Sequence, residues 1–319
     1  MPFKDIRGQK DALQIIKAGM DSGRMGGGYL FSGPDSVGKK MASIILSQAL
    51  NCVLNNNDAC GTCPSCKKIE NGQHPDVHLI SAADGQLRIE DIRQLQKEIN
   101  LKAYEGRFKV FIIDNAHTLT PEASNCLLKV LEEPPSLSLI ILVTDKPGLL
   151  FKTIISRCKI IKFSAQKREE LADELKGSYG LDSTSARFLA YYSEGRLGEA
   201  LRLKGTDIMN TRNSVIDTLS RPSSFSSIGL KVEDKSSLLF ALKILSAWFR
   251  DLYLLKAGVP DSEAINFDRR SDLLKDLSRF SSVDLERILT AISTTVFYSQ
   301  SNINTRLLLL NLRAQIWEK

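Results

Sequence analysis

The segment GPDSVGKK, residues 33–40, constrains the fold of this chain more than any other stretch. It follows a short apolar run, GYLFSG (28–33), and precedes a segment of helical period, MASIILSQALNC (41–52). A glycine-rich turn between a strand and a helix points backbone N–H groups, and the positive end of the helix dipole, at a phosphate. The pattern therefore predicts a phosphate-binding loop in which Gly33, Gly38 and Lys39 contact the phosphates.

Residue 40 departs from this pattern, which places Ser or Thr after the lysine. That hydroxyl normally binds Mg²⁺, whereas the ammonium of Lys40 has no lone pair and repels a cation. A second apolar run, KVFIID, ends in Asp114, the carboxylate expected to anchor Mg²⁺, but the next residue is Asn115 instead of a glutamate that activates water. We expect a degenerate site that binds ATP or ADP without hydrolysis. A glycine-rich turn without a ligand is the alternative.

Apolar runs of strand length recur through the first half of the chain, with segments of helical period between them. Continuous apolar strands joined by crossover helices indicate an α/β fold, with a parallel sheet covered on both faces. The expected strands are 28–33, 76–80, 109–114, 137–144 and 158–163, with further helices at 89–99 and 121–133.

From about residue 164 the chain keeps helical period and shows no strand pattern. We expect three domains: the α/β domain over 1–163, a small helical domain over 164–206 and a larger helical domain over 207–319. A serine-rich loop is expected at 220–229 and a long helix at 235–258. Because that helix is apolar on most of its circumference, it should be buried in a bundle or against another subunit.

Four of the six cysteines cluster in the arrangement Cys52-x7-Cys60-x2-Cys63-x2-Cys66. Four thiolates complete a tetrahedral Zn²⁺ site and leave no open position for water, so such a metal would be structural. The insert over about 52–66 has too few apolar residues for a core of its own, so its folding would depend on the metal. Four reduced cysteines without a ligand are the alternative.

The composition, 43% hydrophobic and 25% charged residues, is that of a soluble globular protein. No apolar run approaches the roughly 20 residues that span a bilayer, and the N-terminal segment lacks the apolar core of a signal peptide. A cytoplasmic location without membrane contact is therefore expected. The net charge of +6 is too modest to indicate nucleic-acid binding. His74 and His78 are expected at the surface or at strand ends.

Taken together, these motifs resemble the clamp-loader subunits of bacterial DNA polymerase III, which belong to the AAA+ class, and among them the delta-prime type. The resemblance covers nearly the whole chain. It includes Gly8-Gln9, the loop GPDSVGKK, the four-cysteine insert, IIDNAH (112–117), LLKVLEEPP (127–135), Ser156-Arg157-Cys158 and NINTRLLLLNL (302–312).

The resemblance implies a hetero-pentamer with tau/gamma and delta subunits that places a sliding clamp on primed DNA. The domain over 164–206 would be the lid, and the domain over 207–319 the collar through which subunits assemble. In the family, the arginine of the Ser-Arg-Cys tripeptide reaches into the ATP site of a neighbour, which makes Arg157 the candidate arginine finger in trans.

Active family members also carry a nucleotide-sensing arginine in the lid, where this chain has Gly198. The departures at Lys40, Asn115 and Gly198 favour a non-hydrolysing, delta-prime-like subunit. A tau/gamma-type ATPase subunit of the same loader is the alternative.

Overall fold

A computed structural model of the chain describes residues 2–54, 57–82, 85–219, 235–299 and 304–317. The chain divides into two compact units, one formed by 1–167 with 196–199 and the other by 168–195 with 200–319. The division of the helical part into a lid over 164–206 and a collar over 207–319 stays a prediction. The loop expected at 220–229 lies outside the described residues.

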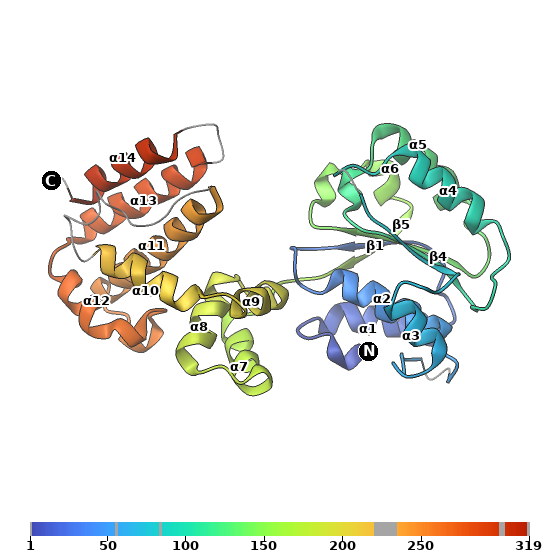
Figure 1. The fold of residues 1–319 in the computed structure, drawn as a ribbon, viewed down its shortest axis with the longest axis horizontal. Helices are drawn as coiled ribbons and strands as arrows, with labels where there is room; N and C mark the ends of the chain where they lie inside the picture. Colours follow the sequence, from blue (N-terminus) through green and yellow to red (C-terminus); the bar gives the residue numbers. More distant parts are fainter. Residues whose placement is uncertain (1, 55–56, 83–84, 220–234, 300–303, 318–319) are drawn as a thin grey trace. The chain divides into compact units, whose positions relative to one another are not determined.

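The first unit contains a five-stranded parallel sheet with the strand order β2-β3-β4-β1-β5, which confirms the predicted α/β fold (Figure 1). Each strand lies within one or two residues of its predicted bounds. The strands are β1 (Gly27–Ser32), β2 (Val77–Ile80), β3 (Lys109–Ile113), β4 (Ser138–Thr144) and β5 (Cys158–Lys162). In a parallel sheet the carboxyl ends of all strands meet at one edge, so the segments that follow β1, β3 and β4 are brought together.

Helices cover both faces of this sheet (Figure 1). On one face lie α1 (Lys10–Asp21), α2 (Lys39–Asn51) and α3 (Pro64–Glu70), and on the other α4 (Ile89–Ile99), α5 (Pro121–Glu132) and α6 (Lys152–Ile155). Short 3₁₀ turns at Phe3–Asp5, Ala116–Thr118 and Pro147–Leu149 complete the unit.

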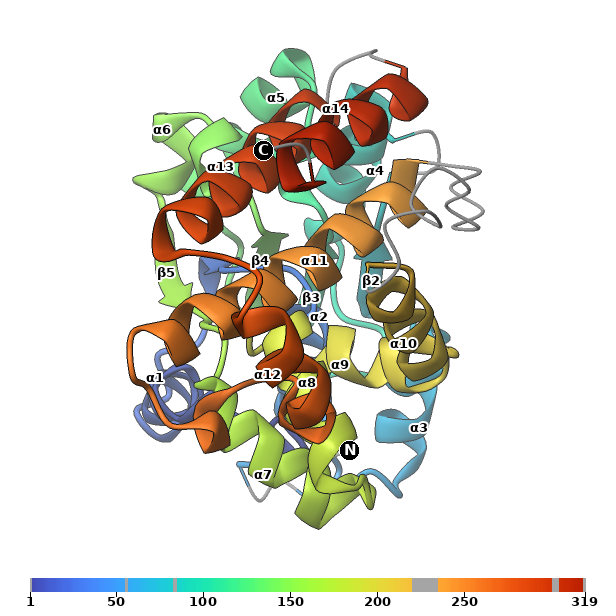
Figure 2. The same cartoon turned by 90° about the vertical axis from the view of Figure 1, so that its left-hand side faces the viewer.

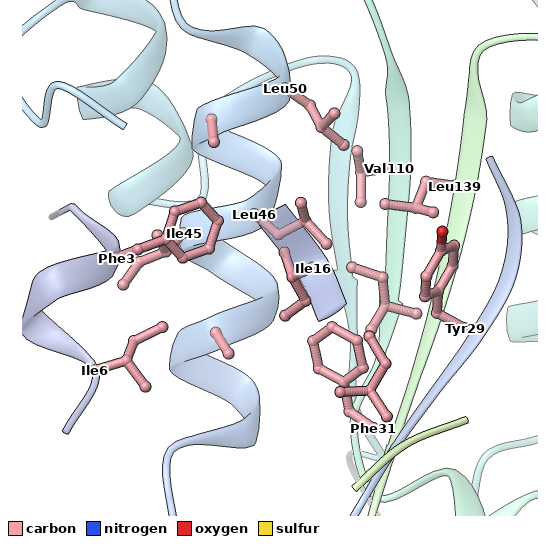
Figure 3. Close-up of a cluster of buried hydrophobic side chains, with 14 of the residues drawn as sticks. Phe3, Ile6, Ile16, Tyr29, Phe31, Ile45, Leu46, Leu50, Val110 and Leu139 are labelled. Carbon is pink, nitrogen blue, oxygen red and sulfur yellow. The ribbon is translucent and has the colours of Figure 1, made fainter. Parts of the chain in front are cut away.

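Alternating residues of the strands pack into two separate hydrophobic cores, one on each face of the sheet. Phe31 of β1 packs into the cluster beneath α1 and α2, together with Ile16 and Leu46 (Figure 3). Its neighbour Leu30 belongs to the opposite cluster, which includes Leu127 of α5. Because successive side chains of a strand point to opposite faces, both faces of the sheet must be apolar, which explains the continuous apolar runs in the sequence.

The described residues of the second unit form helices joined by turns and loops, and none of them forms a strand. Its helices are α7 (Arg168–Tyr179), α8 (Ser183–Tyr192), α9 (Leu197–Lys204), α10 (Ile208–Leu219), α11 (Lys235–Lys256), α12 (Arg270–Leu277), α13 (Ser282–Ser299) and α14 (Thr305–Trp317), with 3₁₀ turns at Asp261–Glu263 and Phe267–Arg269. The first residues of α9, up to 199, are grouped with the first unit.

The long helix α11 lies at the centre of the second unit. It packs against α10, α12 and α13, and Figure 2 shows α11, α13 and α14 running side by side. Trp248 and Leu252 of α11 are fully buried, as the apolar circumference of this segment predicted. Across the residues that the structure describes, no helix is both long and apolar enough to span a membrane.

Candidate nucleotide and metal sites

The predicted phosphate loop connects β1 to α2. Gly33 has φ +150° and Gly38 has φ +97°, conformations that L side chains rarely adopt. A Cβ atom on Gly33 would lie 2.0 Å from the carbonyl oxygen of Phe163, so no larger residue fits this position. Gly38 immediately precedes α2, which begins at Lys39. The backbone conformation of the loop therefore depends on glycine at these positions, and the loop ends at the N-terminus of a 13-residue helix.

Lys39 is turned inward toward the loop. Its Nζ donates hydrogen bonds to the carbonyl oxygen of Gly33 at 2.7 Å and to that of Pro34, and the residue is only 6% exposed. Burial lowers the pKa of Lys39, while the carboxylates of Asp35 and Asp145 oppose that shift. The ammonium is thus held at the loop by backbone carbonyls, at the position from which it would reach a phosphate.

Lys40 forms an ion pair across the carboxyl edge of the sheet. Its Nζ lies 2.9 Å from Oδ2 of Asp114, which directly follows β3. The other carboxylate oxygen of Asp114, Oδ1, accepts a hydrogen bond from the backbone N–H of Asn115 at 3.1 Å. Both oxygens of the expected metal ligand are therefore engaged, one of them by a cation. Mg²⁺ requires oxygen ligands in near-octahedral geometry, so this donor set does not fit it.

The residues after β3 and β4 supply further polar groups at the same edge. Nδ1 of His117 lies 3.1 Å from Oγ1 of Thr144 and 3.3 Å from Oδ1 of Asp145. The side chain of Asn115 is exposed and its backbone has φ +52°, a region that asparagine tolerates. Asp145 was not predicted as a site residue, although its place directly after a buried strand is a signal visible in the sequence.

Gly198 contacts the phosphate loop through its backbone. Its N–H donates to the carbonyl oxygen of Ser36 at 2.9 Å, and both residues belong to the first compact unit. A Cβ atom at position 198 would lie 2.8 Å from that oxygen. This close approach requires glycine. Position 198, where the resemblance implies an arginine in active family members, therefore has no room for a side chain in this arrangement.

Arg157 lies far from the phosphate loop of its own chain. It follows α6 and precedes β5, whose first residue, Cys158, pairs with Gly28 at the amino end of β1. The loop begins at the opposite, carboxyl end of β1. The guanidinium of Arg157 forms an ion pair with Oε1 of Glu132 at 2.8 Å and donates to the carbonyl oxygen of Thr153 at 3.0 Å. Its side chain is 36% exposed, so the group also reaches solvent.

The four predicted cysteines converge. Their sulfur atoms all lie within 4.8 Å of one another, and those of Cys60 and Cys66 are 3.9 Å apart. Four thiolates around Zn²⁺, with Zn–S bonds of about 2.3 Å, give sulfur–sulfur distances of about 3.8 Å. The arrangement therefore fits a tetrahedral metal.

The backbone of the insert stabilises the thiolate of Cys60, whereas burial raises the pKa of Cys66 to about 12. Cys63 is the N-cap of α3, where its sulfur accepts from the N–H of Cys66 at 3.4 Å. The N–H of Cys63 in turn donates to the sulfur of Cys60 at 3.3 Å, and with Thr62 it lowers the pKa of Cys60 to about 5. A lowered pKa stabilises the anionic form that binds metal.

His74 was expected at the surface or at a strand end. It lies three residues before β2 and is only 3% exposed, with Glu105 and Gly106 close to its ring. Nδ1 of His74 accepts from the N–H of Asp76 at 3.1 Å. His78 lies within β2, half-buried and stacked on Phe111. Neither histidine belongs to the four-cysteine cluster.

The fold and loop geometry define a phosphate-loop α/β protein in which Lys40, after the loop lysine, forms an ion pair with Asp114 after β3. A family model described as "DNA polymerase III, delta subunit" matches residues 8–167. The gamma subunit of DNA polymerase III from Buchnera aphidicola is 34% identical over 261 residues, covering 76% of this chain and 72% of that protein. The chain therefore belongs to the family of DNA polymerase III clamp-loader subunits.

Other relatives carry different subunit names. The delta' subunit of Bacillus subtilis is 32% identical over 62% of this chain and 60% of its own length, and the tau subunit of Escherichia coli is 35% identical over 63% of this chain and 32% of its own length. The chain thus spans only part of these two relatives. Since gamma, tau and delta' are matched at similar identity, the comparisons define the family without distinguishing the delta-prime role.

Among solved structures, a gamma-subunit-related protein of DNA polymerase III from Thermotoga maritima is similar at 18% identity. The likeness covers 96% of this chain and 99% of that one, with a TM-score of 0.44. The Thermotoga maritima Holliday junction branch migration motor RuvB is similar at 17% identity over 68% of this chain and 66% of its own, with a TM-score of 0.45.

Proposed function

We propose that this chain is a delta-prime-like subunit of the DNA polymerase III clamp loader, that it does not hydrolyse ATP, and that it supplies Arg157 to the ATP site of a neighbouring subunit. The ion pair between Lys40 and Asp114 carries the proposal. The ion pair engages the carboxylate expected to bind Mg²⁺, and lysine stands where the second ligand, a hydroxyl, is expected. Without the metal, the developing charge of phosphoryl transfer is not neutralised. Asn115 also lacks the carboxylate that activates water.

The location of Arg157 supports a role outside its own nucleotide site. The guanidinium lies at the amino edge of the sheet, whereas the phosphate loop lies at the carboxyl edge. Glu132, at the end of α5, and the carbonyl group of Thr153 orient the side chain without burying it. An arginine finger stabilises the charge of a transferring phosphoryl group and contributes about 10³–10⁵ in rate in other systems.

The partners in this proposal are the tau/gamma and delta subunits of a hetero-pentamer, the sliding clamp and primed DNA within that complex. Assembly would use the collar over 207–319, and the lid over 164–206 would lie between the collar and the α/β domain in the sequence. Membership of the clamp-loader family supports a multi-subunit complex.

Two ligands complete the proposal. ATP or ADP would bind through Gly33, Gly38 and Lys39 without being hydrolysed, because the loop has the backbone path and the lysine of a phosphate site. A structural Zn²⁺ would bind the cluster of Cys52, Cys60, Cys63 and Cys66, whose sulfur positions fit its geometry.

A tau/gamma-type ATPase is the second candidate, because relatives with those names match this chain as well as the delta' relative does. The replacement of the metal-binding hydroxyl by Lys40 argues against it.

The finger is tested by reconstituting the loader with Arg157→Ala. We expect clamp- and DNA-stimulated ATP hydrolysis to fall by about tenfold or more, because one composite site loses its transition-state charge. Gel filtration should show the complex still assembled. Lys152→Ala, which removes an exposed cation from α6 close in sequence, is the matched control and should retain activity. Unchanged hydrolysis by an assembled Arg157→Ala complex would rule out the finger.

A further inference from the structure

The two lysines of the phosphate loop are held in different ways. Lys39 is buried and bonded to loop carbonyls, whereas the side chain of Lys40 is 46% exposed and reaches across to Asp114. An ammonium group has three donor hydrogens. The single ion pair to Oδ2 uses one of them, so the group retains donors for a second anion at the same edge of the sheet.

The ammonium group of Lys40 belongs to the residue whose side chain normally binds Mg²⁺ in a phosphate loop. In a phosphate-loop site, the residue after the loop lysine and the carboxylate at the end of the strand hold Mg²⁺ between them, against the β- and γ-phosphates. Here those two residues are Lys40 and Asp114, and they bind each other at 2.9 Å. Mg²⁺ would have to displace Lys40 from Asp114, and the side chain of residue 40 offers it no oxygen ligand.

We propose that Lys40 replaces the metal, so that this site binds a nucleoside di- or triphosphate in its metal-free form. The inference rests on the proposed nucleotide site and specifies its ligand. Lys39 and Lys40 both bring an ammonium group to the loop, and Asp114 positions the second of them. Charge-assisted hydrogen bonds from an ammonium to phosphate oxygens are short and strong.

The same arrangement explains why binding would not lead to hydrolysis. A protein ammonium neutralises part of the polyphosphate charge in the ground state, but it does not bridge the leaving and transferring groups as the metal does. Chelation of the nucleotide by Mg²⁺ in solution occupies the oxygens that Lys40 would contact. The free nucleotide should therefore bind at least as tightly as its magnesium complex.

The test titrates the full chain with a fluorescent ADP analogue, once in excess EDTA and once in excess MgCl₂. For the wild type we expect saturable binding in EDTA that Mg²⁺ does not tighten. Lys40→Ser restores the metal-binding hydroxyl and frees Asp114. It should lose about tenfold or more in affinity in EDTA, because a charge-assisted contact to phosphate is removed, and should regain affinity in Mg²⁺.

Lys10→Ser, which removes an exposed cation at the start of α1, is the matched control and should bind as the wild type does in both media. Circular dichroism spectra and urea midpoints of the three proteins establish that each is folded.

The possible results distinguish the role of Lys40 from the existence of the nucleotide site. Wild-type binding that requires Mg²⁺, or a Lys40→Ser variant that binds equally well in EDTA, would overturn the role of Lys40 and leave the nucleotide site intact. The absence of saturable binding in both media, at millimolar ligand, would overturn the nucleotide site itself. The arginine finger would be unaffected by either result, since the loader assay tests it separately.

Discussion

Asp76 shows how one buried carboxylate organises a distant loop. It is 1% exposed and accepts hydrogen bonds from the backbone N–H groups of Tyr104, Glu105 and Gly106, at 2.8–2.9 Å. Burial raises the pKa of Asp76, but the three N–H donors outweigh it and the net shift is downward. The ionised carboxylate therefore holds the segment that precedes β3 against the segment that precedes β2.

We predict that Asp76→Asn lowers the free energy of unfolding by about 2–4 kcal/mol at neutral pH, because the amide leaves a buried N–H donor unsatisfied. Urea unfolding of wild type and variant measures the difference. Glu133→Gln, an exposed charge at the end of α5, is the control and should change little. Equal urea midpoints for the wild type and Asp76→Asn would contradict the prediction.

The pH dependence has a definite sign. Because the folded pKa of Asp76 is lowered, its contribution is fully present above the unfolded value of about 3.9 and is lost as the pH falls through the folded pKa. The difference between wild type and variant should therefore shrink in acid.

At the scale of elements, the cysteine insert contrasts with the sheet. The strands bury apolar side chains on both faces, whereas α3 has seven residues and only Cys66 and Ile69 buried. A segment with so little apolar burial does not offset the entropy of ordering its chain. The four converging sulfur atoms supply the missing stabilisation once a metal joins them.

We predict one Zn²⁺ per chain, and we predict that a strong chelator unfolds the insert while the sheet persists. The lost metal-dependent folding energy is on the order of 10 kcal/mol. Metal analysis gives the stoichiometry, and amide exchange of residues 57–71 against that of β3 and β4 locates the change. Cys63→Ser should lose the metal, while Cys126→Ser should keep it. A metal-free wild type with a protected insert would refute the site.

At the scale of the whole molecule, the two proposed functional groups lie at opposite edges of one sheet. The phosphate loop follows the carboxyl end of β1, and Arg157 precedes the amino end of β5. Because the strands are parallel and bonded side by side, substitutions at one edge need not disturb the other. A subunit can therefore lose its own catalysis and still retain an intact finger for a neighbour.

It follows that the isolated chain should not turn over ATP. We expect steady-state phosphate release to equal that of Lys39→Ala, in which the loop lysine is removed, at any Mg²⁺ concentration. Phosphate release from the purified full chain measures this. Sustained turnover that Lys39→Ala abolishes would instead favour the tau/gamma-type ATPase.

Much of the fold was predictable because its causes are local. Burial on both faces produces continuous apolar strands such as 109–114, and the loop glycines and the cysteine spacing are visible within a few residues. The burial of His74 was missed because the residues close to its ring, Glu105 and Gly106, are distant in sequence and follow no periodic pattern. The partner of Arg157, Glu132, was missed for the same reason.

The order of residues alone was enough to establish a parallel α/β domain, a phosphate loop without its hydroxyl and a four-cysteine cluster, since each depends on short-range sterics and hydropathy. Only the folded chain showed that Lys40 binds Asp114, that Gly198 lies against Ser36 and that Arg157 is held at the opposite edge of the sheet. These contacts join segments that only strand pairing and packing bring together, and no local pattern encodes which groups then meet.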